Sequence, residues 1–211
     1  SIAVTISSDG NTFGTSATLG GVTVSSISVD ASGNVTASVV ATCGAANVAF
    51  TLKATNNIAA TATATLNITV TTNTVPVLSY NAASITAGNG TTVSPATATD
   101  NGSITGYSIV SVVPALTVAP TVNASGVVSL TNAGPSGNHV ITVQATDNCG
   151  ATSTTSFTLT VNCQTITVNP TALGSATTGT AFSQTFTQTG ALGSVTWSLI
   201  SSAPPGLSFN A

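Results

Sequence analysis

The chain has 211 residues and a formal net charge of −3, with 42% hydrophobic and only 2% charged residues. The five charged side chains are Asp9, Asp30, Lys53, Asp100 and Asp147. Phosphate binding needs several Lys or Arg side chains, so the composition excludes nucleic acid as a partner. So few titratable groups also leave little for acid–base catalysis, and we expect that the protein is not an enzyme.

Thr and Ser make up a third of the chain, with 42 and 27 residues, and they interrupt every apolar stretch. A membrane-spanning helix needs about 18 consecutive apolar residues, so we predict no membrane insertion. Three Cys and scarce Lys fit an oxidising compartment better than the cytosol. We therefore predict an extracellular, cell-surface location.

The chain repeats itself with a period of about 90 residues. In the first segment, "VDASGNV" from Val29 matches "VNASGVV" from Val122, and "NVAFTLKATNN" from Asn47 matches "NHVITVQATDN" from Asn138. Further on, "YSIVSVVPAL" matches "WSLISSAPPGL" from Trp197. These matches predict an N-terminally incomplete domain at 1–73, a complete domain at 74–164, and the first half of a third domain at 165–211.

Each segment alternates apolar and hydroxylic residues and contains turn signals every 8 to 12 residues. Around 90 residues with about seven short strands predict all-β, tandem Ig-like β-sandwich domains arranged end to end. In the complete domain we expect strands near Val77–Ser79, Val93–Thr99, Gly106–Val112, Leu116–Leu130, Val140–Thr146 and Thr152–Val161.

Alternation also predicts which side chains face the core. Lys53 and Gln144 lie at outward positions between residues that should point inward, which are Phe50, Leu52, Ala54, Ile141, Val143 and Ala145. Tyr107 and Trp197 are equivalent in the repeat, and we expect each to fill the centre of its sandwich as a core aromatic. His139 opens a strand and is expected to be half-buried.

Two stretches resemble the Ig-like repeats of large bacterial cell-surface adhesins. "GTAFSQTFTQTG" and "TWSLISSAPPGLSF", within Cys163–Ala211, resemble the first half of such a repeat, and "VQATDNCGATSTTSFTLTVNC" from Val143 resembles the closing hairpin. The opening "SIAVTISSDGNTFGTSATLGGVTVSS" has no clear counterpart. Gliding-motility adhesins contain arrays of this kind, so the resemblance implies a structural or adhesive role without catalytic residues.

Asp100 and Asp147 follow strands whose loops lie at one end of an Ig-like domain. Carboxylates and carbonyls in such loops could hold Ca²⁺, which prefers six to eight oxygen ligands. Alternatively, each Asp accepts hydrogen bonds from its own turn. We expect the turn role and no cofactor, with Ca²⁺ as the alternative.

The three Cys lie in different loops. Cys149 and Cys163 are separated by a strand of about 46 Å, too far for a disulfide. In an Ig topology, Cys43 of the first unit and Cys149 of the second face one another, which predicts an inter-domain Cys43–Cys149 disulfide. Cys163 would then pair with a cysteine outside this sequence. Three unpaired thiols are the alternative.

Five sequons mark candidate glycosylation sites, at Asn34, Asn67, Asn89, Asn101 and Asn123. Three functions remain open. The chain is a stalk of an adhesin, a filament subunit joined by strand complementation between incomplete terminal domains, or a carbohydrate-binding accessory module. The expected partners are neighbouring repeats or copies of itself, together with a surface or glycan ligand that the sequence does not identify.

Overall fold

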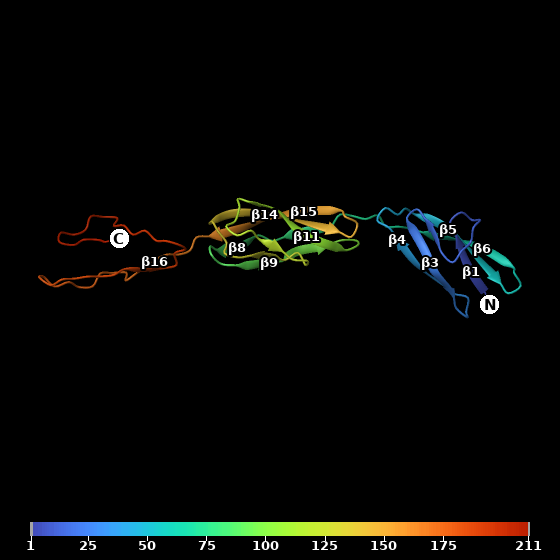
Figure 1. Cartoon of the computed structure of the whole chain (residues 1–211), viewed down its shortest axis with the longest axis horizontal. Helices are drawn as coiled ribbons and strands as arrows, with labels where there is room; N and C mark the ends of the chain where they lie inside the picture. The colour runs from blue at the N-terminus through green and yellow to red at the C-terminus, as the bar shows by residue number, and fades with distance from the viewer. Residues whose placement is uncertain (1, 211) are drawn as a thin grey trace. The chain divides into compact units, whose positions relative to one another are not determined.

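The computed structural model describes residues 2–210, which form strands and loops without a helix (Figure 1). No helix within this range could therefore span a membrane. The chain forms two compact units. The first contains the described residues up to Pro76 together with the loops Thr99–Ile104 and Thr146–Thr152, and the second contains the rest. The boundaries at 73 and 164 remain predictions, since the second unit extends beyond residue 164.

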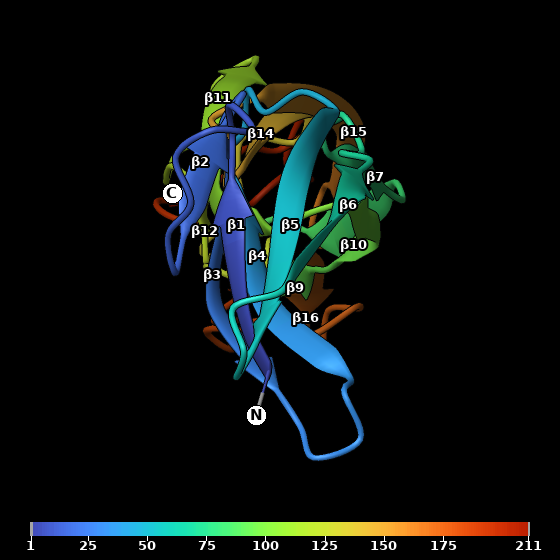
Figure 2. The same cartoon turned by 90° about the vertical axis from the view of Figure 1, so that its right-hand side faces the viewer.

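Six strands form the first unit: β1 (Ile2–Ser7), β2 (Ala17–Leu19), β3 (Val22–Val29), β4 (Val35–Ala41), β5 (Val48–Asn56) and β6 (Thr61–Ile68). They make two sheets, in the orders β1-β5-β6 and β2-β3-β4. Figure 2 looks onto the first sheet, with β3 and β4 behind it. The buried core is small and consists of Ile6, Val22, Val24 and Phe50.

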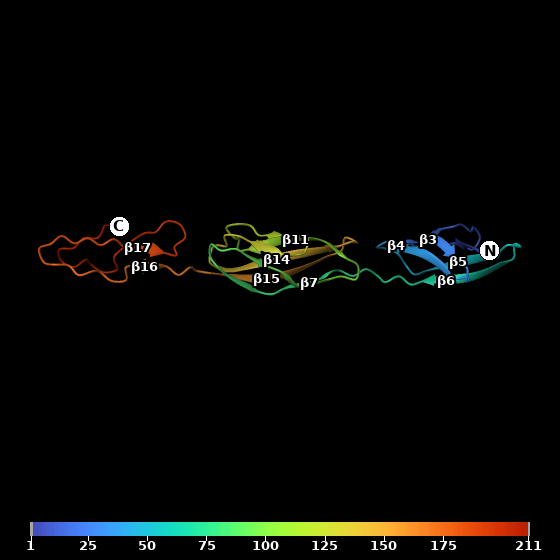
Figure 3. The same ribbon diagram turned by 90° about the horizontal axis from the view of Figure 1, so that it is seen from below.

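The remaining strands are β7 (Val77–Tyr80), β8 (Ala83–Thr86), β9 (Thr91–Val93), β10 (Pro95–Thr99), β11 (Ile104–Val113), β12 (Thr121–Val122), β13 (Val128–Leu130), β14 (Gly137–Asp147), β15 (Thr152–Asn162), β16 (Thr167–Asn169) and β17 (Thr187–Thr189). They form the sheets β11-β14-β15-β8, β12-β13-β9, β10-β7 and β16-β17. Figure 3 shows β16 beside β17. The sheets built on β14–β15 and on β13 give the two layers of an Ig-like sandwich.

Alternating side chains explain how β14 packs in this sandwich. Ile141, Val143 and Ala145 are completely buried, which confirms the predicted inward face. In β5, Phe50 is buried in the same way, whereas Lys53 places its Nζ 4.1 Å from the centre of the Phe13 ring. Lys53 is thus a half-buried cation–π partner on the outer face.

Three of the expected strand ranges differ in detail from the structure. The expected strand over Val93–Thr99 is split into β9 and β10, and the region Leu116–Leu130 holds only the short β12 and β13. Strand β14 begins at Gly137, earlier than the predicted start at Val140. The split at Ser94 precedes Pro95, which has no N–H to donate to a continuous strand ladder.

The centre of the second unit is also filled differently from the prediction. Tyr80 and Phe157 are buried and stack with ring centroids 5.2 Å apart, and the Tyr80 hydroxyl donates to the Gly126 carbonyl. Tyr107 is half-buried and packs against this cluster. Trp197 is half-buried but lies outside the two buried clusters, because the chain around it forms no strand among the described residues.

Candidate functional site

Four of the residues singled out in the sequence, Asp100, Asn101, Asp147 and Cys149, lie in the loops Thr99–Ile104 and Thr146–Thr152, both of which belong to the first compact unit. Asp147 organises the second loop. Its Oδ1 accepts the backbone N–H groups of Cys149 and Ala151, both at 2.8 Å, and its Oδ2 accepts the Asn73 amide at 2.7 Å. These bonds, with the Asn73 amide as the largest contributor, lower the pKa of the buried Asp147 carboxyl.

A second turn in the same chain shows what this carboxylate does. Asn56 ends β5 as Asp147 ends β14. Its Oδ1 accepts the N–H groups of Ile58 and Ala60 at 3.0 and 2.9 Å, at the same spacing along the chain. A neutral amide therefore satisfies the same turn, so the turn needs an acceptor oxygen rather than a negative charge.

Asp100 has a different role in the neighbouring loop. Its Oδ2 accepts the Gly102 N–H at 2.7 Å, whereas its Oδ1 is buried and no donor among the described residues reaches it. Asn148 closes the loop, because its Oδ1 accepts the Ser103 N–H and its own N–H donates to the Ser103 carbonyl. A Cβ on Gly102 would lie 2.5 Å from Asn148 Oδ1, so any other residue there would have to displace the Asn148 side chain.

These loops also hold the extended segment that follows β6. The Asn101 amide donates to the Thr72 carbonyl at 2.8 Å, and Asn101 Oδ1 accepts the Thr74 N–H at 3.1 Å. Together with the bond from Asn73 to Asp147, these contacts fix three consecutive residues. Such a pair of Asn clamps suits a structural connection, since every group involved satisfies backbone or amide partners.

Cys43 and Cys149 form a disulfide with Cα atoms 5.4 Å apart and a sequence separation of 106 residues. The bond closes a covalent loop of the chain, and this loop includes the segment Thr72–Thr74 and the Asp100 turn. Cys149 is placed for this bond by the Asp147 turn, which fixes its backbone N–H. Carboxylate, amide clamp and disulfide are therefore one structural unit, which we call the crosslinked turn.

The two carboxylates of the crosslinked turn accept hydrogen bonds from the protein itself. Asp147 accepts three N–H donors, and Asp100 uses one oxygen in the same way. Within residues 2–210 there is no group of three or more His, Cys, Asp or Glu side chains that could hold a metal ion. Ca²⁺ would need six to eight oxygens, most of which these two loops do not offer as side chains.

His139 lies elsewhere, in β14, and its predicted half-exposure is wrong. The ring is completely buried, with Nδ1 at 2.8 Å from the Pro114 carbonyl and Nε2 at 2.9 Å from the Pro135 carbonyl. The early start of β14 explains this, because it places His139 at an inward position of the strand. The imidazole therefore joins two loops to the sandwich.

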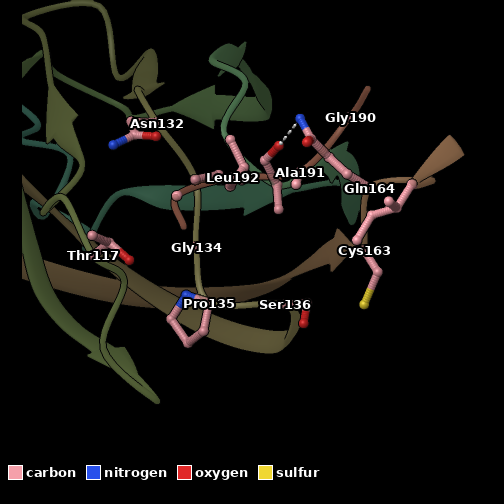
Figure 4. Close-up of a pocket in the computed structure, with 14 residues that line it drawn as sticks. Thr117, Asn132, Gly134, Pro135, Ser136, Cys163, Gln164, Gly190, Ala191 and Leu192 are labelled. Carbon is pink, nitrogen blue, oxygen red and sulfur yellow. Dashed lines mark hydrogen bonds between the residues drawn. The ribbon is translucent and has the colours of Figure 1, made fainter. Parts of the chain in front are cut away.

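Cys163 is exposed and unpaired. It borders a pocket of about 550 Å³ in the second unit, where Gln164 Nε2 donates to the Ala87 carbonyl at 3.1 Å (Figure 4). Small and polar residues of the loop around Gly134 and the segment around Leu192 form much of the lining. No titratable pair faces this pocket, which offers shape but no evident chemistry.

A second pocket, of about 700 Å³, lies among residues 173–210 and is lined by aromatic side chains that include Phe182, Phe186 and Trp197. It also has polar edges, among them Gln184 and Asn210. Aromatic faces with amides at the rim are a combination that can hold a sugar ring. In an Ig-like repeat, however, the same residues would belong to the core.

All five sequon asparagines are exposed. Two of them already use the amide, since Asn34 donates to Asp30 and Asn101 donates to Thr72. Asn123 accepts the N–H groups of Ser125 and Val127 through its Oδ1, in the same kind of turn that Asp30 forms. The pKa of Asp30 is lowered, chiefly by the Asn34 amide. Three of the five sequon asparagines, Asn34, Asn101 and Asn123, thus make side-chain hydrogen bonds within the protein.

No protein-family model and no curated protein matches the chain. Among solved structures it is similar to the fibronectin(III)-like modules of Clostridium thermocellum CbhA, with 18% identity over 76% of this chain and 77% of that one and a TM-score of 0.34. The chain is also similar to the human desmocollin-1 ectodomain, with 15% identity and a TM-score of 0.37. This match covers 82% of this chain and 36% of the desmocollin-1 chain. A third similar structure is BT4661, a SusE-like surface polysaccharide-binding protein from Bacteroides thetaiotaomicron. Its sequence identity is 18% and its TM-score is 0.37, and the match covers 65% of this chain and 22% of BT4661.

The chain thus spans less than two thirds of the last two proteins. At this level of similarity, the assignment of an all-β, Ig-like fold rests on the strand topology of the chain itself. The amide clamps formed by Asn73 and Asn101 were missed in the sequence. Their only signal is the pair of "TDN" turns, in which an Asp precedes an Asn, and that signal does not identify the partner segment.

Proposed function

We propose that the chain is a structural segment, a stalk, of an extracellular cell-surface adhesin of the kind that the repeat resemblance implies. The disulfide between Cys43 and Cys149 is the observation that supports this most directly. Disulfides persist in oxidising, extracellular surroundings. Tension on the two chain ends would pass through the sulfur atoms and bypass the residues between them, which suits a load-bearing module.

The chemistry of the crosslinked turn supports the same proposal. Its carboxylates accept hydrogen bonds from turns, and Asn56 does the same work without a charge. We therefore propose no catalytic role and no resident cofactor. Cys163 extends the scheme, because an exposed thiol after β15 is suited to a bond with a cysteine of a following repeat.

A carbohydrate-binding module is the second candidate, favoured by the aromatic pocket around Trp197. Glycan-array binding separates the two. A stalk segment binds no glycan, and Trp197→Ala changes nothing on the array. A module of the second kind binds a defined set of glycans and loses that binding on the same substitution.

Surface labelling tests the proposal itself. An antibody raised against residues 1–211 is applied to intact cells of the source organism and to lysed cells. The stalk proposal predicts labelling of intact cells, and loss of the label from cells treated with an external protease. Labelling that appears only after lysis would refute it.

Exposed sequons such as Asn67 and Asn89 predict a glycan mass on the same surface material if the organism glycosylates asparagine.

A further inference from the structure

Asn-Gly pairs occur at two places in the chain, Asn89–Gly90 and Asn101–Gly102. An Asn side chain is chemically labile when glycine follows it, because glycine has no Cβ to shield its backbone nitrogen. That nitrogen can attack the Asn side-chain carbonyl and close a succinimide ring. Both pairs lie in exposed loops, and a hydroxylic residue follows each of them. A difference in reactivity between the two pairs therefore reflects the fold around each one.

Hydrogen bonds hold both reacting groups of the Asn101 pair. The Asn101 amide donates to the Thr72 carbonyl at 2.8 Å, and its Oδ1 accepts the Thr74 N–H at 3.1 Å. The Gly102 N–H donates to Asp100 Oδ2 at 2.7 Å. The Asn101 side chain must leave its clamp, and the Gly102 nitrogen must leave its acceptor, before the two groups can react. The fold therefore protects this pair.

The Asn89 pair, in the loop between β8 and β9, has neither restraint. Asn89 bonds only through its backbone, whose N–H donates to the Thr86 carbonyl at 3.1 Å and whose carbonyl accepts the Ala133 N–H at 2.9 Å. Within residues 2–210, the Asn89 side chain has no hydrogen-bond partner and the Gly90 N–H has no acceptor. Both residues are exposed. The nitrogen and the side-chain carbonyl are thus free to react with one another.

We propose that Asn89–Gly90 is a self-modification site, which converts to aspartate and isoaspartate without an enzyme. The Gly90 nitrogen attacks Asn89 Cγ and forms a C–N bond, its proton passes through solvent to the leaving amide group, and ammonia departs. Water then opens the succinimide at either carbonyl. One opening restores the original backbone and gives aspartate, and the other routes the backbone through the side-chain carbon and gives isoaspartate. The net reaction exchanges water for ammonia, and intramolecular proximity of the reacting groups drives it.

Conversion at Asn89 changes the charge of the second unit. That unit contains no Asp, Glu, Lys or Arg, because all five charged residues of the chain belong to the first unit. A new carboxyl group at this exposed position is ionised at neutral pH. The product is therefore one unit more negative than the formal net charge of −3. In a chain with so few charges, ion exchange separates it readily from the starting material.

The isoaspartate product also changes the backbone next to a sheet. The Asn89 carbonyl holds the Ala133 N–H, and a Cβ on Gly90 would lie 2.8 Å from the Leu130 carbonyl, so the two segments approach closely here. Strand β9 begins at the next residue, where Thr91 pairs with Leu130 of β13. An additional backbone carbon at this point displaces the start of β9 from β13. The modification thus loosens one layer of the sandwich as the protein ages, which goes beyond a stalk role.

Peptide mapping by mass spectrometry tests the proposal on the unsubstituted chain, made in a host that does not glycosylate asparagine and incubated at neutral pH. In the folded chain, Asn89 should convert at least about tenfold faster than Asn101, as expected when several hydrogen bonds must break first at Asn101. In guanidinium chloride with reductant, the two should convert at similar rates, because their local sequences match. Equal rates in the folded chain, or no conversion of Asn89, would overturn the proposal.

Two variants identify the residue that forms the acidic product. Asn89→Gln should greatly slow its formation, since Gln would have to close a larger and less favourable ring. Asn81→Gln is the matched control, an exposed Asn followed by Ala82, and should form the product as the unsubstituted chain does. Hydrogen exchange of the isoaspartate fraction should show lost protection of the Ala133 amide. Unchanged formation of the acidic product in Asn89→Gln would overturn the proposal. None of these results bears on surface labelling, so the stalk proposal is tested separately.

Discussion

Removing the disulfide should lower the free energy of unfolding of the whole chain by a large and calculable amount. The perturbation is the double substitution Cys43→Ser with Cys149→Ser. The bond closes a loop with a sequence separation of 106 residues. For a loop of that length, the chain-entropy relation gives about 4.7 kcal/mol of stabilisation at 25 °C, through restriction of the unfolded chain. That is a large fraction of the 5–15 kcal/mol typical of folded domains.

Guanidinium chloride unfolding, followed by far-ultraviolet circular dichroism without reductant, measures this loss. We expect the unfolding transition to move to lower denaturant in the double variant. Reductant should move the unsubstituted chain to the same place and leave the double variant unchanged. Cys163→Ser is the matched control, because that thiol is exposed and unpaired, and it should have no effect. An unchanged transition in the double variant would refute the crosslinked turn as a source of stability.

Three further predictions concern the core, pH and metal. Phe157→Ala should lower the free energy of unfolding by about 3–5 kcal/mol, because the Phe157 ring is buried against Tyr80. Trp197→Ala should lower it clearly less. Equal losses for the two variants in denaturant titrations would contradict the core described here. The thermal midpoint should be nearly constant between about pH 5 and pH 9. Because the pKa of Asp147 is lowered in the folded protein, this carboxyl stabilises the fold above about pH 4, and the stabilisation is lost on further acidification. Burial, with a smaller effect of Tyr107, raises the pKa of Tyr80 to about 12. The stabilisation by the Tyr80 hydroxyl is therefore lost only as the pH rises from about 10 through 12. A midpoint that shifts by tens of degrees within the flat range would be inconsistent with this. Excess Ca²⁺ should leave the midpoint unchanged, and a rise that EDTA reverses would instead support a Ca²⁺ site.

The sequence was most informative where side chains alternate over a long stretch. In β14 the inward residues Ile141, Val143 and Ala145 follow from period two alone, and the Ig-like class follows from the repeated short strands. The same reasoning could not locate the central aromatics. Tyr80 lies in the four-residue β7, which is too short for alternation to assign a face, whereas Tyr107 was expected in the core because it matches Trp197 in the repeat.

Other features depend on contacts between distant residues. The burial of His139 depends on the carbonyls of Pro114 and Pro135, whose positions are set by loops of irregular backbone. The clamp formed by Asn101 depends on Thr72 and Thr74, 27 to 29 residues away in the sequence. No local pattern contains that information.

Single-molecule pulling on the two chain ends tests most directly the claim that the Cys43–Cys149 bond takes the load. A separation of 106 residues corresponds to about 350–380 Å of extended chain at 3.3–3.6 Å per residue. The account predicts that the fully unfolded chain is shorter by this length without reductant than with it, and that the Cys43→Ser, Cys149→Ser variant is long in both conditions. Equal contour lengths of the unsubstituted chain with and without reductant would contradict it.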